Sequence, residues 1–386
     1  MSEQTIRIAF LDYSPIFAGA ERVLFNVIKH IDRHRFEPIL VFPYPMEHQH
    51  RYDDLKCEKI YLSDGLKWWM GSDRWKHPMK GTDFLKRSIF GYRIMRCIKD
   101  KHIDILDVNL MRADVKMWVW ATKKFTNAKI IGHYRSQDQD WVAPADAQKL
   151  FDIIACVSEF SKMRFQLKGH FVRAEVLYDS VDVDVMKCNL SKKQAKERLG
   201  YREDSILMTS VGQLSKHKGH DTAIFAFSRI CKDFPNARLL IAGGGNKELI
   251  DYYRNLAEKL DISDKVSVPG KQLGNIQDVY RATDLTLSLT KVGEGFGLVP
   301  YESALIGTPF IAPNFGAVLE FVNDGETGLL VDTNNLDSVE RKIRYALNHP
   351  KEMSKMVDRL QVIINNKLTP EILVNNLDQL YSSCLE

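Results

Sequence analysis

Short apolar runs alternate with segments of helix length along most of the chain. In the first half these runs are Ile6 to Leu11, Ile39 to Phe42, Ile103 to Val108, Ile130-Ile131, Ile153 to Val157 and Val176-Leu177. The second half adds Ile206 to Val211, Leu239 to Ala242 and Leu285 to Leu289. Short runs made mainly of apolar residues are typical of strands buried on both faces. The pattern therefore predicts an α/β fold, with parallel sheets covered by helices on both faces.

The stretch from Thr290 to Glu302 joins the run at Leu285 to Leu289 to a predicted helix over Leu298 to Ile306. A strand, a glycine-rich turn and a helix form an anion site, because the N–H groups at the helix start lack intrahelical partners. Glu294 lies in the turn and Glu302 about a turn and a half into the helix, so both can face one bound ligand. An ordinary strand-to-helix connection with solvated acids is the alternative for this stretch taken alone.

Two other predicted strands end in turns that contain glycine. Ala18-Gly19-Ala20-Glu21 opens a helix in the first half, and Gly212 to Asp221, which contains Lys218-Gly219, follows the run at Ile206 to Val211. His133 stands at the end of a third predicted strand. In parallel sheets with helices on both faces, ligands bind at the carboxyl ends of the strands. Spacing alone leaves open whether this single histidine is structural or functional.

Length and composition narrow the class of protein. A chain of 386 residues exceeds one typical compact domain and suits two. Its 45% hydrophobic and 27% charged residues are typical of a soluble globular protein. No basic segment followed by an apolar core begins the chain, and no apolar run has membrane-spanning length, so we expect neither export nor an anchor. The six cysteines are scattered singly, which favours a reducing cytoplasm over a zinc site or a disulfide framework.

The formal net charge of +4 is unevenly distributed. The stretch from Leu66 to Lys101 contains ten Lys or Arg, three Asp and three of the six tryptophans, and its part from Phe84 is spaced for an amphipathic helix. Basic residues with interfacial aromatics favour peripheral contact with an anionic membrane, on its inner face. A solvated face over a small satellite core and a basic groove for an acidic acceptor are the alternatives. Nucleic acid binding is not expected, because the net charge is small and no recognised module is present.

These motifs and their order resemble the retaining glycosyltransferases of family 4, which have the GT-B fold. The resemblance is dense from Val211 to Val331 and looser from Ile6 to Asp182. It implies that Glu294 contacts the transferred sugar and that Glu302 binds the ribose of the nucleotide. Backbone N–H donors would come from Phe296, Gly297 and Leu298.

The same resemblance implies roles for residues on the other turns. The Gly19 loop would approach the donor phosphates from the first domain, and Lys218 would neutralise the pyrophosphate. The backbone near Gln272 would read the base. His133 would lie close to the reacting sugar, with Arg135 and Asp138 nearby.

The chain departs from the family pattern at three places. Ala18 and the pair Asp179-Ser180 stand where glycine and Asn-Gly are usual, and Gln213 replaces an arginine of the phosphate loop. A glutamine amide donates a hydrogen bond but lacks the bidentate charged clamp of a guanidinium. Either Lys216 or His217 compensates, or Lys218 and the helix start at Gly297 hold more of the phosphate charge.

The implied architecture is two Rossmann-like parallel-sheet domains facing a cleft. Residues 1–184 would form the acceptor-side domain and residues 185–368 the domain that binds the nucleotide sugar. Residues 369–386 would form a helix that begins near Pro370 and returns to the first domain. A polar, lysine-rich linker is expected near Asp184 to Tyr201.

The implied reaction moves a sugar from a UDP- or GDP-linked donor to a hydroxyl of a glycan or lipid-linked acceptor, with retention of configuration. We expect it in polysaccharide, lipopolysaccharide or glycoconjugate biosynthesis. Stabilising the leaving phosphate is the main catalytic task. No cofactor and no metal are expected, because no Asp-x-Asp triplet is suited to holding a metal on the diphosphate except Asp182 to Asp184, which falls in the expected linker. A sugar-nucleotide epimerase and a non-catalytic nucleotide-sugar-binding scaffold are the alternatives, the latter favoured by the departures at Ala18, Gln213 and Asp179-Ser180.

Overall fold

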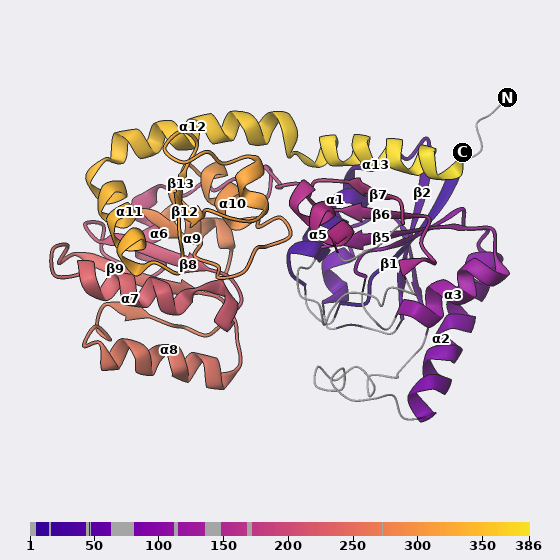
Figure 1. The fold of residues 1–386 in the computed structure, drawn as a ribbon, viewed down its shortest axis with the longest axis horizontal. Helices are drawn as coiled ribbons and strands as arrows, with labels where there is room; N and C mark the ends of the chain where they lie inside the picture. Colours follow the sequence, from indigo (N-terminus) through magenta and orange to yellow (C-terminus); the bar gives the residue numbers. More distant parts are fainter. Residues whose placement is uncertain are drawn as a thin grey trace. The chain divides into compact units, whose positions relative to one another are not determined.

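The computed structural model describes residues 5–14, 17–43, 46, 48–62, 81–111, 115–135, 148–167, 172–271 and 273–386, with side chains from residue 88 onward in the segment that starts at 81 (Figure 1). The chain forms two compact units. The first consists of Met1–Ser180 with Pro370–Glu386, and the second of Val181–Thr369.

A seven-stranded sheet with the order β3-β2-β1-β4-β5-β6-β7 is the centre of the first unit, and every neighbouring pair is parallel. Its strands are β1 (Ile6–Leu11), β2 (Phe36–Phe42), β3 (Glu58–Tyr61), β4 (Ile105–Val108), β5 (Lys129–Tyr134), β6 (Ile153–Cys156) and β7 (Ala174–Val176). Its helices are α1 (Gly19–His30), η1 (Gln49–Tyr52), α2 (Gly81–Asp100), α3 (Lys116–Phe125), α5 (Glu159–Leu167) and α13 (Pro370–Leu385).

Alternate residues of each strand enter two separate cores, because successive side chains point to opposite faces. In β1, Ile8 and Phe10 pack in the core shared with α1 and α13, whereas Ala9 and Leu11 pack in the core shared with α2 and α3. Figure 1 shows α13 and α2 on opposite sides of the strands. The predicted parallel sheet buried on both faces is confirmed.

The second unit has a six-stranded parallel sheet with the order β10-β9-β8-β11-β12-β13. Its strands are β8 (Ile206–Val211), β9 (Ala237–Ala242), β10 (Val266–Ser267), β11 (Leu285–Leu287), β12 (Phe310–Pro313) and β13 (Leu329–Val331). Its helices are α6 (Lys192–Arg198), η6 (Lys216–Lys218), α7 (His220–Ile230), α8 (Lys247–Lys259), α9 (Ile276–Ala282), α10 (Val299–Leu305), η7 (Ala317–Glu320), α11 (Leu336–Asn348) and α12 (Pro350–Lys367). Helices α7, α8 and α11 share one core, and α6 and α9 share another.

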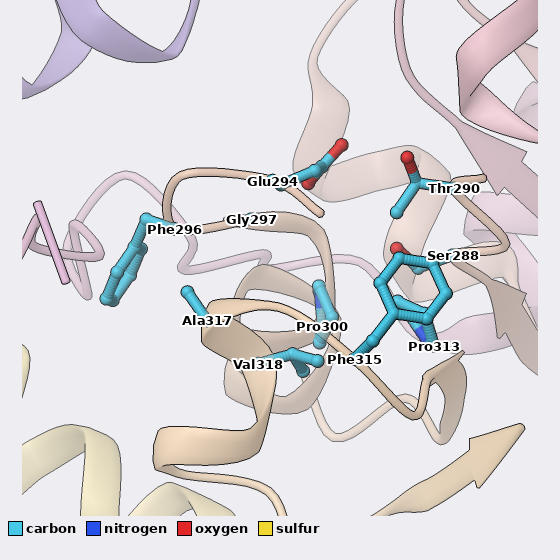
Figure 2. Close-up of a pocket in the computed structure, with 10 residues that line it drawn as sticks. All are labelled: Ser288, Thr290, Glu294, Phe296, Gly297, Pro300, Pro313, Phe315, Ala317 and Val318. Atoms are coloured by element: carbon cyan, nitrogen blue, oxygen red, sulfur yellow. The ribbon is translucent and has the colours of Figure 1, made fainter. Parts of the chain in front are cut away.

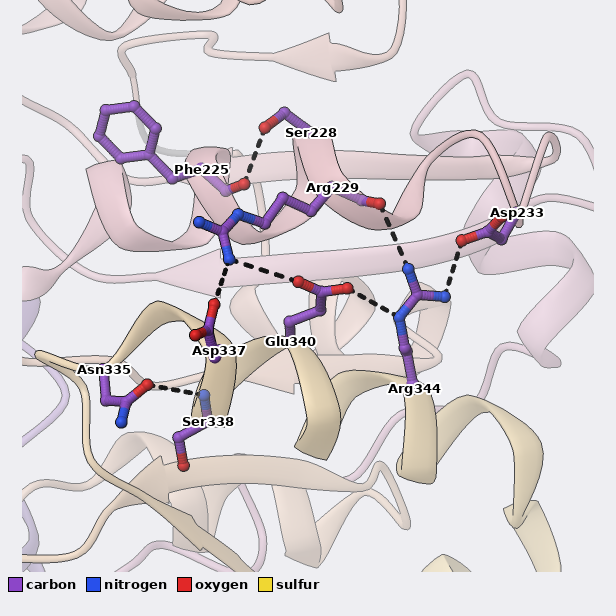
Figure 3. Close-up of polar contacts among 9 residues, drawn as sticks. All are labelled: Phe225, Ser228, Arg229, Asp233, Asn335, Asp337, Ser338, Glu340 and Arg344. Atoms are coloured by element: carbon purple, nitrogen blue, oxygen red, sulfur yellow. Dashed lines mark hydrogen bonds and ion pairs between the residues drawn. The ribbon is translucent and has the colours of Figure 1, made fainter.

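Ion pairs at the surface connect α7 to α11 (Figure 3). Arg229 of α7 lies 2.5 Å from Asp337 and 3.5 Å from Glu340 of α11. Arg344 of α11 returns toward α7, 2.7 Å from Asp233 and 2.9 Å from Glu340. Ion pairs between solvent-exposed side chains contribute little to the free energy of unfolding. These pairs therefore align the two helices more than they stabilise the unit.

Two sequence expectations about the architecture need correction. The segment from Asp184 to Tyr201, expected as a linker, contains α6 and belongs to the second unit, where Ala195 is fully buried. The chain leaves the first unit at Ser180, four residues before the boundary expected at 184. Strand β3 was not predicted, because its residues at the sheet edge include Glu58 and Lys59 and lack an apolar run.

Candidate functional site

The loops at the carboxyl ends of β8 and β11 touch through Gly219. Its backbone has φ of +71°, and a Cβ added there would lie 1.8 Å from the carbonyl oxygen of Leu289. Only glycine avoids both the left-handed backbone strain and this clash. The Lys-Gly sequence at this turn therefore has a structural reason as well as the role that the resemblance implies.

Hydrogen bonds hold the same two loops together. The backbone N–H of Lys291 donates to the carbonyl of His217 at 2.7 Å, and the Thr290 hydroxyl donates to the same oxygen at 3.0 Å. The Lys291 ammonium lies 2.5 Å from the carboxylate of Asp221 at the start of α7. The stretch from Thr290 to Glu302 is thus a fixed neighbour of the Lys218 loop.

Lys218 and Glu294 form an ion pair across these loops. Both side chains are partly exposed, at 33% and 22%, so a ligand can reach them from solvent. Gln213, whose position matches the missing arginine, and the neighbouring Lys216 and His217 are exposed on the same loop. The structure therefore brings Lys218, Glu294 and Gln213 to one edge of the second sheet.

The turn after Glu294 leads directly into α10. Gly297 has φ of +82°, and a Cβ there would lie 2.8 Å from Glu294 Oε2. Leu298 is the residue before the helix, and Pro300 occupies its first turn. Phe296 is buried against Tyr301, with ring centroids 5.1 Å apart, so it supports the turn from below. The predicted strand, glycine turn and helix are present in this order.

A pocket that is partly open to solvent lies beside this turn (Figure 2). Its lining is Ser288, Thr290, Glu294, Phe296, Gly297, Pro300, Pro313, Phe315, Ala317 and Val318. Polar side-chain atoms come from Glu294, Thr290 and Ser288, and the other side chains of the lining are apolar. A small ligand with both hydroxyls and apolar carbons suits such a lining.

Glu302 lies inside α10 rather than at the surface. Its side chain is buried, and Oε2 accepts a hydrogen bond of 2.8 Å from the hydroxyl of Tyr280. The expected contact of Glu302 with a ribose remains a prediction.

Sequence reasoning missed His220, the first residue of α7. Its ring is fully buried, with Nδ1 2.8 Å from the Ser210 hydroxyl and Nε2 3.3 Å from the carbonyl oxygen of Gln213. Burial lowers the pKa of His220 to about 4, so the neutral ring fixes the loop at Gln213 to the start of α7. The signal in the sequence that could have identified His220 is its position directly after Lys218-Gly219.

In the first unit, Gly19 is the first residue of α1. The N–H of Ala18 donates to Glu21 Oε2 at 2.8 Å, which closes the turn on itself. Glu21 is 1% exposed, and burial, together with the nearby charge of Asp12, raises its pKa to about 6. Asp12 in turn accepts a hydrogen bond of 2.7 Å from Tyr52. The chemistry of the Gly19 loop therefore includes a buried carboxyl pair that the sequence pattern did not indicate.

His133 lies near the carboxyl end of β5, as predicted. Its Nε2 is 2.9 Å from Asp107 Oδ1, and its Nδ1 is 3.4 Å from the guanidinium of Arg135. Arg135 also pairs with Asp179, one of the residues that departs from the family pattern. The amide of Asn109, just beyond β4, is buried with no hydrogen-bond partner among the described residues. Asp107 was missed although an aspartate inside the run Ile103 to Val108 was a visible signal.

Three groups of residues singled out from the sequence lie wholly or partly outside the described residues. These are Gln272, Asp138 and the basic stretch from Leu66 to Lys101, of which only the side chains from residue 88 are described. Within the described residues every helix falls short of what a membrane span requires in length and apolar character. Those residues also contain no cluster of three or more His, Cys, Asp or Glu side chains suited to a metal ion.

Solved structures resemble the whole chain in fold. A glycosyltransferase from Rickettsia africae matches 99% of this chain and 99% of its own with a TM-score of 0.82 at 18% identity. Anabaena HepE, solved in complex with UDP and glucose, matches 98% of this chain and 100% of its own with a TM-score of 0.80 at 16% identity. The predicted GT-B class of two Rossmann-like parallel sheets is confirmed.

Sequence comparisons match part of the chain. D-inositol 3-phosphate glycosyltransferase of Mycolicibacterium smegmatis is 33% identical over 168 residues, which are 42% of this chain and only 37% of that protein. The family model described as glycosyl transferases group 1 matches residues 191–361, the region that contains Lys218, Glu294 and Gly297. The similarity to the glycosyl transferases group 1 family therefore lies in the part of the chain that contains the candidate site.

Proposed function

We propose that this protein is a retaining glycosyltransferase that moves a sugar from a nucleotide-sugar donor to a hydroxyl acceptor. The observation that supports it best is the Lys218–Glu294 pair, held at one sheet edge by two interlocked loops. One cation and one carboxylate side by side suit a donor whose phosphate meets Lys218 while its sugar hydroxyls meet Glu294.

In the proposed reaction the bond from the anomeric carbon to the diphosphate breaks as the acceptor oxygen bonds from the same face. The charge that develops on the diphosphate needs stabilisation, which Lys218 and the N–H groups after Gly297 would supply. Glu294 would hold the donor sugar beside the pocket of Figure 2. Gln213 offers only a neutral amide, so Lys218 would hold a larger share of the phosphate charge than in a relative with arginine there.

The donor would be UDP- or GDP-linked, and the acceptor a glycan or a lipid-linked glycan. HepE was solved in complex with UDP-glucose, and this similarity makes UDP-glucose the first donor to test. A panel of nucleotide sugars, with release of nucleoside diphosphate as the readout, tests the proposal. Conversion of the donor to an isomer would instead indicate an epimerase, and binding without turnover a scaffold.

Two substitutions test the site assignment. Lys218→Ala and Glu294→Ala should each lower turnover by well over tenfold, roughly 1.4 kcal/mol or more of transition-state stabilisation. Lys342→Ala is a matched control, because Lys342 forms a similarly exposed pair with Asp324 in the same unit, away from these loops. Equal turnover in Lys218→Ala and Lys342→Ala would contradict the assignment.

Metal independence belongs to the same proposal. Turnover should persist undiminished in excess chelator, because Lys218 and backbone N–H groups are proposed to hold the phosphate charge. Loss of turnover on chelation, with recovery on adding Mg²⁺ or Mn²⁺, would contradict it.

We also propose peripheral contact with an anionic membrane through the basic stretch, on the cytoplasmic side. The described part of α2 supports it, because the core-facing residues Phe90, Ile94 and Ile98 are buried while Tyr92 and Arg96 are exposed.

Helix α3, which packs beside α2 over the same core, extends this surface. Trp120 and Phe125 are exposed there, and Lys124 lies over both rings. Aromatic rings among cations suit the interface of an anionic bilayer.

Vesicle flotation tests the membrane contact. The protein should bind vesicles with anionic lipid and not neutral ones, and Trp120→Ala should weaken binding several-fold. Tyr252→Ala, at an exposed aromatic residue of the second unit, is the control. Equal binding to both kinds of vesicle, or none, would contradict the contact.

A further inference from the structure

The last helix of the chain places one hydroxyl inside the first unit. Helix α13 packs Leu373, Leu377 and Leu380 into the core shared with β1 and β2, and Tyr381 follows them fully buried. The Tyr381 hydroxyl lies 2.7 Å from Asp107 Oδ2. Burial and the charge of Asp107 raise the pKa of Tyr381 well above its usual value, so the hydroxyl keeps its proton and donates.

The carboxylate of Asp107 therefore faces two donors. Oδ2 accepts from Tyr381, and His133 Nε2 lies between the two oxygens, 2.9 Å from Oδ1 and 3.1 Å from Oδ2. A carboxylate only accepts hydrogen bonds, so His133 must have a proton on Nε2 to bond to it. Asp107 is 1% exposed and His133 4%, so water has little access to replace either bond.

Arg135 faces the other ring nitrogen. Its NH2 lies 3.4 Å from His133 Nδ1, and a guanidinium can only donate. Nδ1 is therefore the acceptor, and the neutral Nε2–H tautomer is the one that satisfies both neighbours. The ring orientation is set by Arg135, two residues along the chain, by the more distant Asp107 and, through Asp107, by Tyr381.

We propose that Tyr381 is a positioning residue for His133. Its hydroxyl fixes the rotamer of Asp107, and Asp107 fixes the ring orientation and tautomer of His133 at the sheet edge. Without the hydroxyl, the buried carboxylate loses one of its two donors, and it is free to rotate against the single donor that remains, His133 Nε2. The catalytic consequence rests on the proposed transferase function, whereas the structural part does not.

The test compares Tyr381→Phe with Tyr52→Phe. Both substitutions remove a hydroxyl that donates at 2.7 Å to a buried aspartate of the first unit, but only Tyr381 bonds to the partner of His133. Nitrogen-15 NMR of histidine-labelled protein reports the tautomer, and the signal missing from His133→Gln assigns the residue.

In the native protein His133 should be in the Nε2–H tautomer with slow proton exchange. Tyr381→Phe should speed exchange of that proton at least about threefold and mix the tautomers, whereas Tyr52→Phe should leave the His133 signals unchanged. An unchanged tautomer and exchange rate in Tyr381→Phe overturn the proposal. Asp107→Asn serves if Tyr381→Phe does not fold: the neutral amide is a weaker acceptor than the carboxylate, so exchange of the Nε2 proton should speed at least about threefold, and an unchanged exchange rate overturns the proposal equally.

Kinetics supply the second readout. Tyr381→Phe should lower kcat about threefold to tenfold with the donor KM within about twofold of native, as expected for lost orientation rather than lost donor binding. An unchanged kcat overturns the positioning role. A native protein without turnover refutes the proposed function instead, and the NMR comparison still decides the role of Tyr381.

Discussion

Gly219→Ala tests the contact between the two loops of the second unit most directly. The left-handed backbone at φ of +71° costs an alanine about 1–2 kcal/mol. The added Cβ would also lie 1.8 Å from the Leu289 carbonyl oxygen, a backbone atom that cannot rotate away. Overpacking of this kind costs about 1–3 kcal/mol, so we expect a total of about 4 kcal/mol. For a unit of this size that corresponds to a fall in Tm of roughly 8–16 °C.

Gly200→Ala is the matched control for this prediction. Gly200 is in the same unit and has φ of +81°, but a Cβ there meets nothing within 4 Å. Only the backbone term applies, so its Tm should fall by roughly 3–6 °C.

Calorimetry can assign the affected transition to one unit. All six tryptophans precede residue 181, so tryptophan fluorescence follows the first unit, and the transition seen only by calorimetry belongs to the second. If the two variants lower that transition by the same amount within 2 °C, the loops do not touch at Gly219 and the site geometry is wrong.

Two further predictions concern pH and have opposite signs. Burial raises the pKa of Glu21 from 4.5 to about 6, so the protonated carboxyl stabilises the first unit by about 2 kcal/mol below pH 4.5, and this contribution is lost as the pH rises through 6. Unfolding of Glu21→Gln, followed by tryptophan fluorescence, should lack this dependence of stability on pH. A pH dependence as steep as that of the native protein would contradict the burial argument. Burial lowers the pKa of His220 from 6.5 to about 4, so its contribution of about 3 kcal/mol to the stability of the second unit is present above pH 6.5 and lost as the pH falls through 4. In His220→Gln, the Tm of the second unit measured by calorimetry should depend less on pH over that window. Arg229→Ala, in contrast, should change the Tm of the second unit by less than about 2 °C, although Arg229 forms two ion pairs. A larger fall in Tm would show that the network of Figure 3 stabilises the unit.

The sequence predicted most strands and turns correctly, because each of them depends on residues that are close together in the chain. A buried parallel strand needs a continuous apolar run, and β1 and β8 match the expected runs at Ile6 to Leu11 and Ile206 to Val211. Strand β3 lies at the edge of its sheet, where its side chains are only partly buried, and it has no such run. The apolar pattern therefore did not predict it. The segment around α6 has the polar composition of a linker, because only Ala195 and Lys196 of that helix are buried.

Apolar runs and turn residues were enough to predict two parallel sheets with glycine turns, a lysine, a glutamate and a histidine at their strand ends. What those residues contact depends on the tertiary structure. Lys218 meets Glu294, and Asp107 meets both His133 and Tyr381, only after strands and helices distant in sequence become neighbours. The period of apolar residues fixes which face of an element is buried, whereas strand order and helix docking fix which polar groups meet, and these depend on contacts across the whole unit.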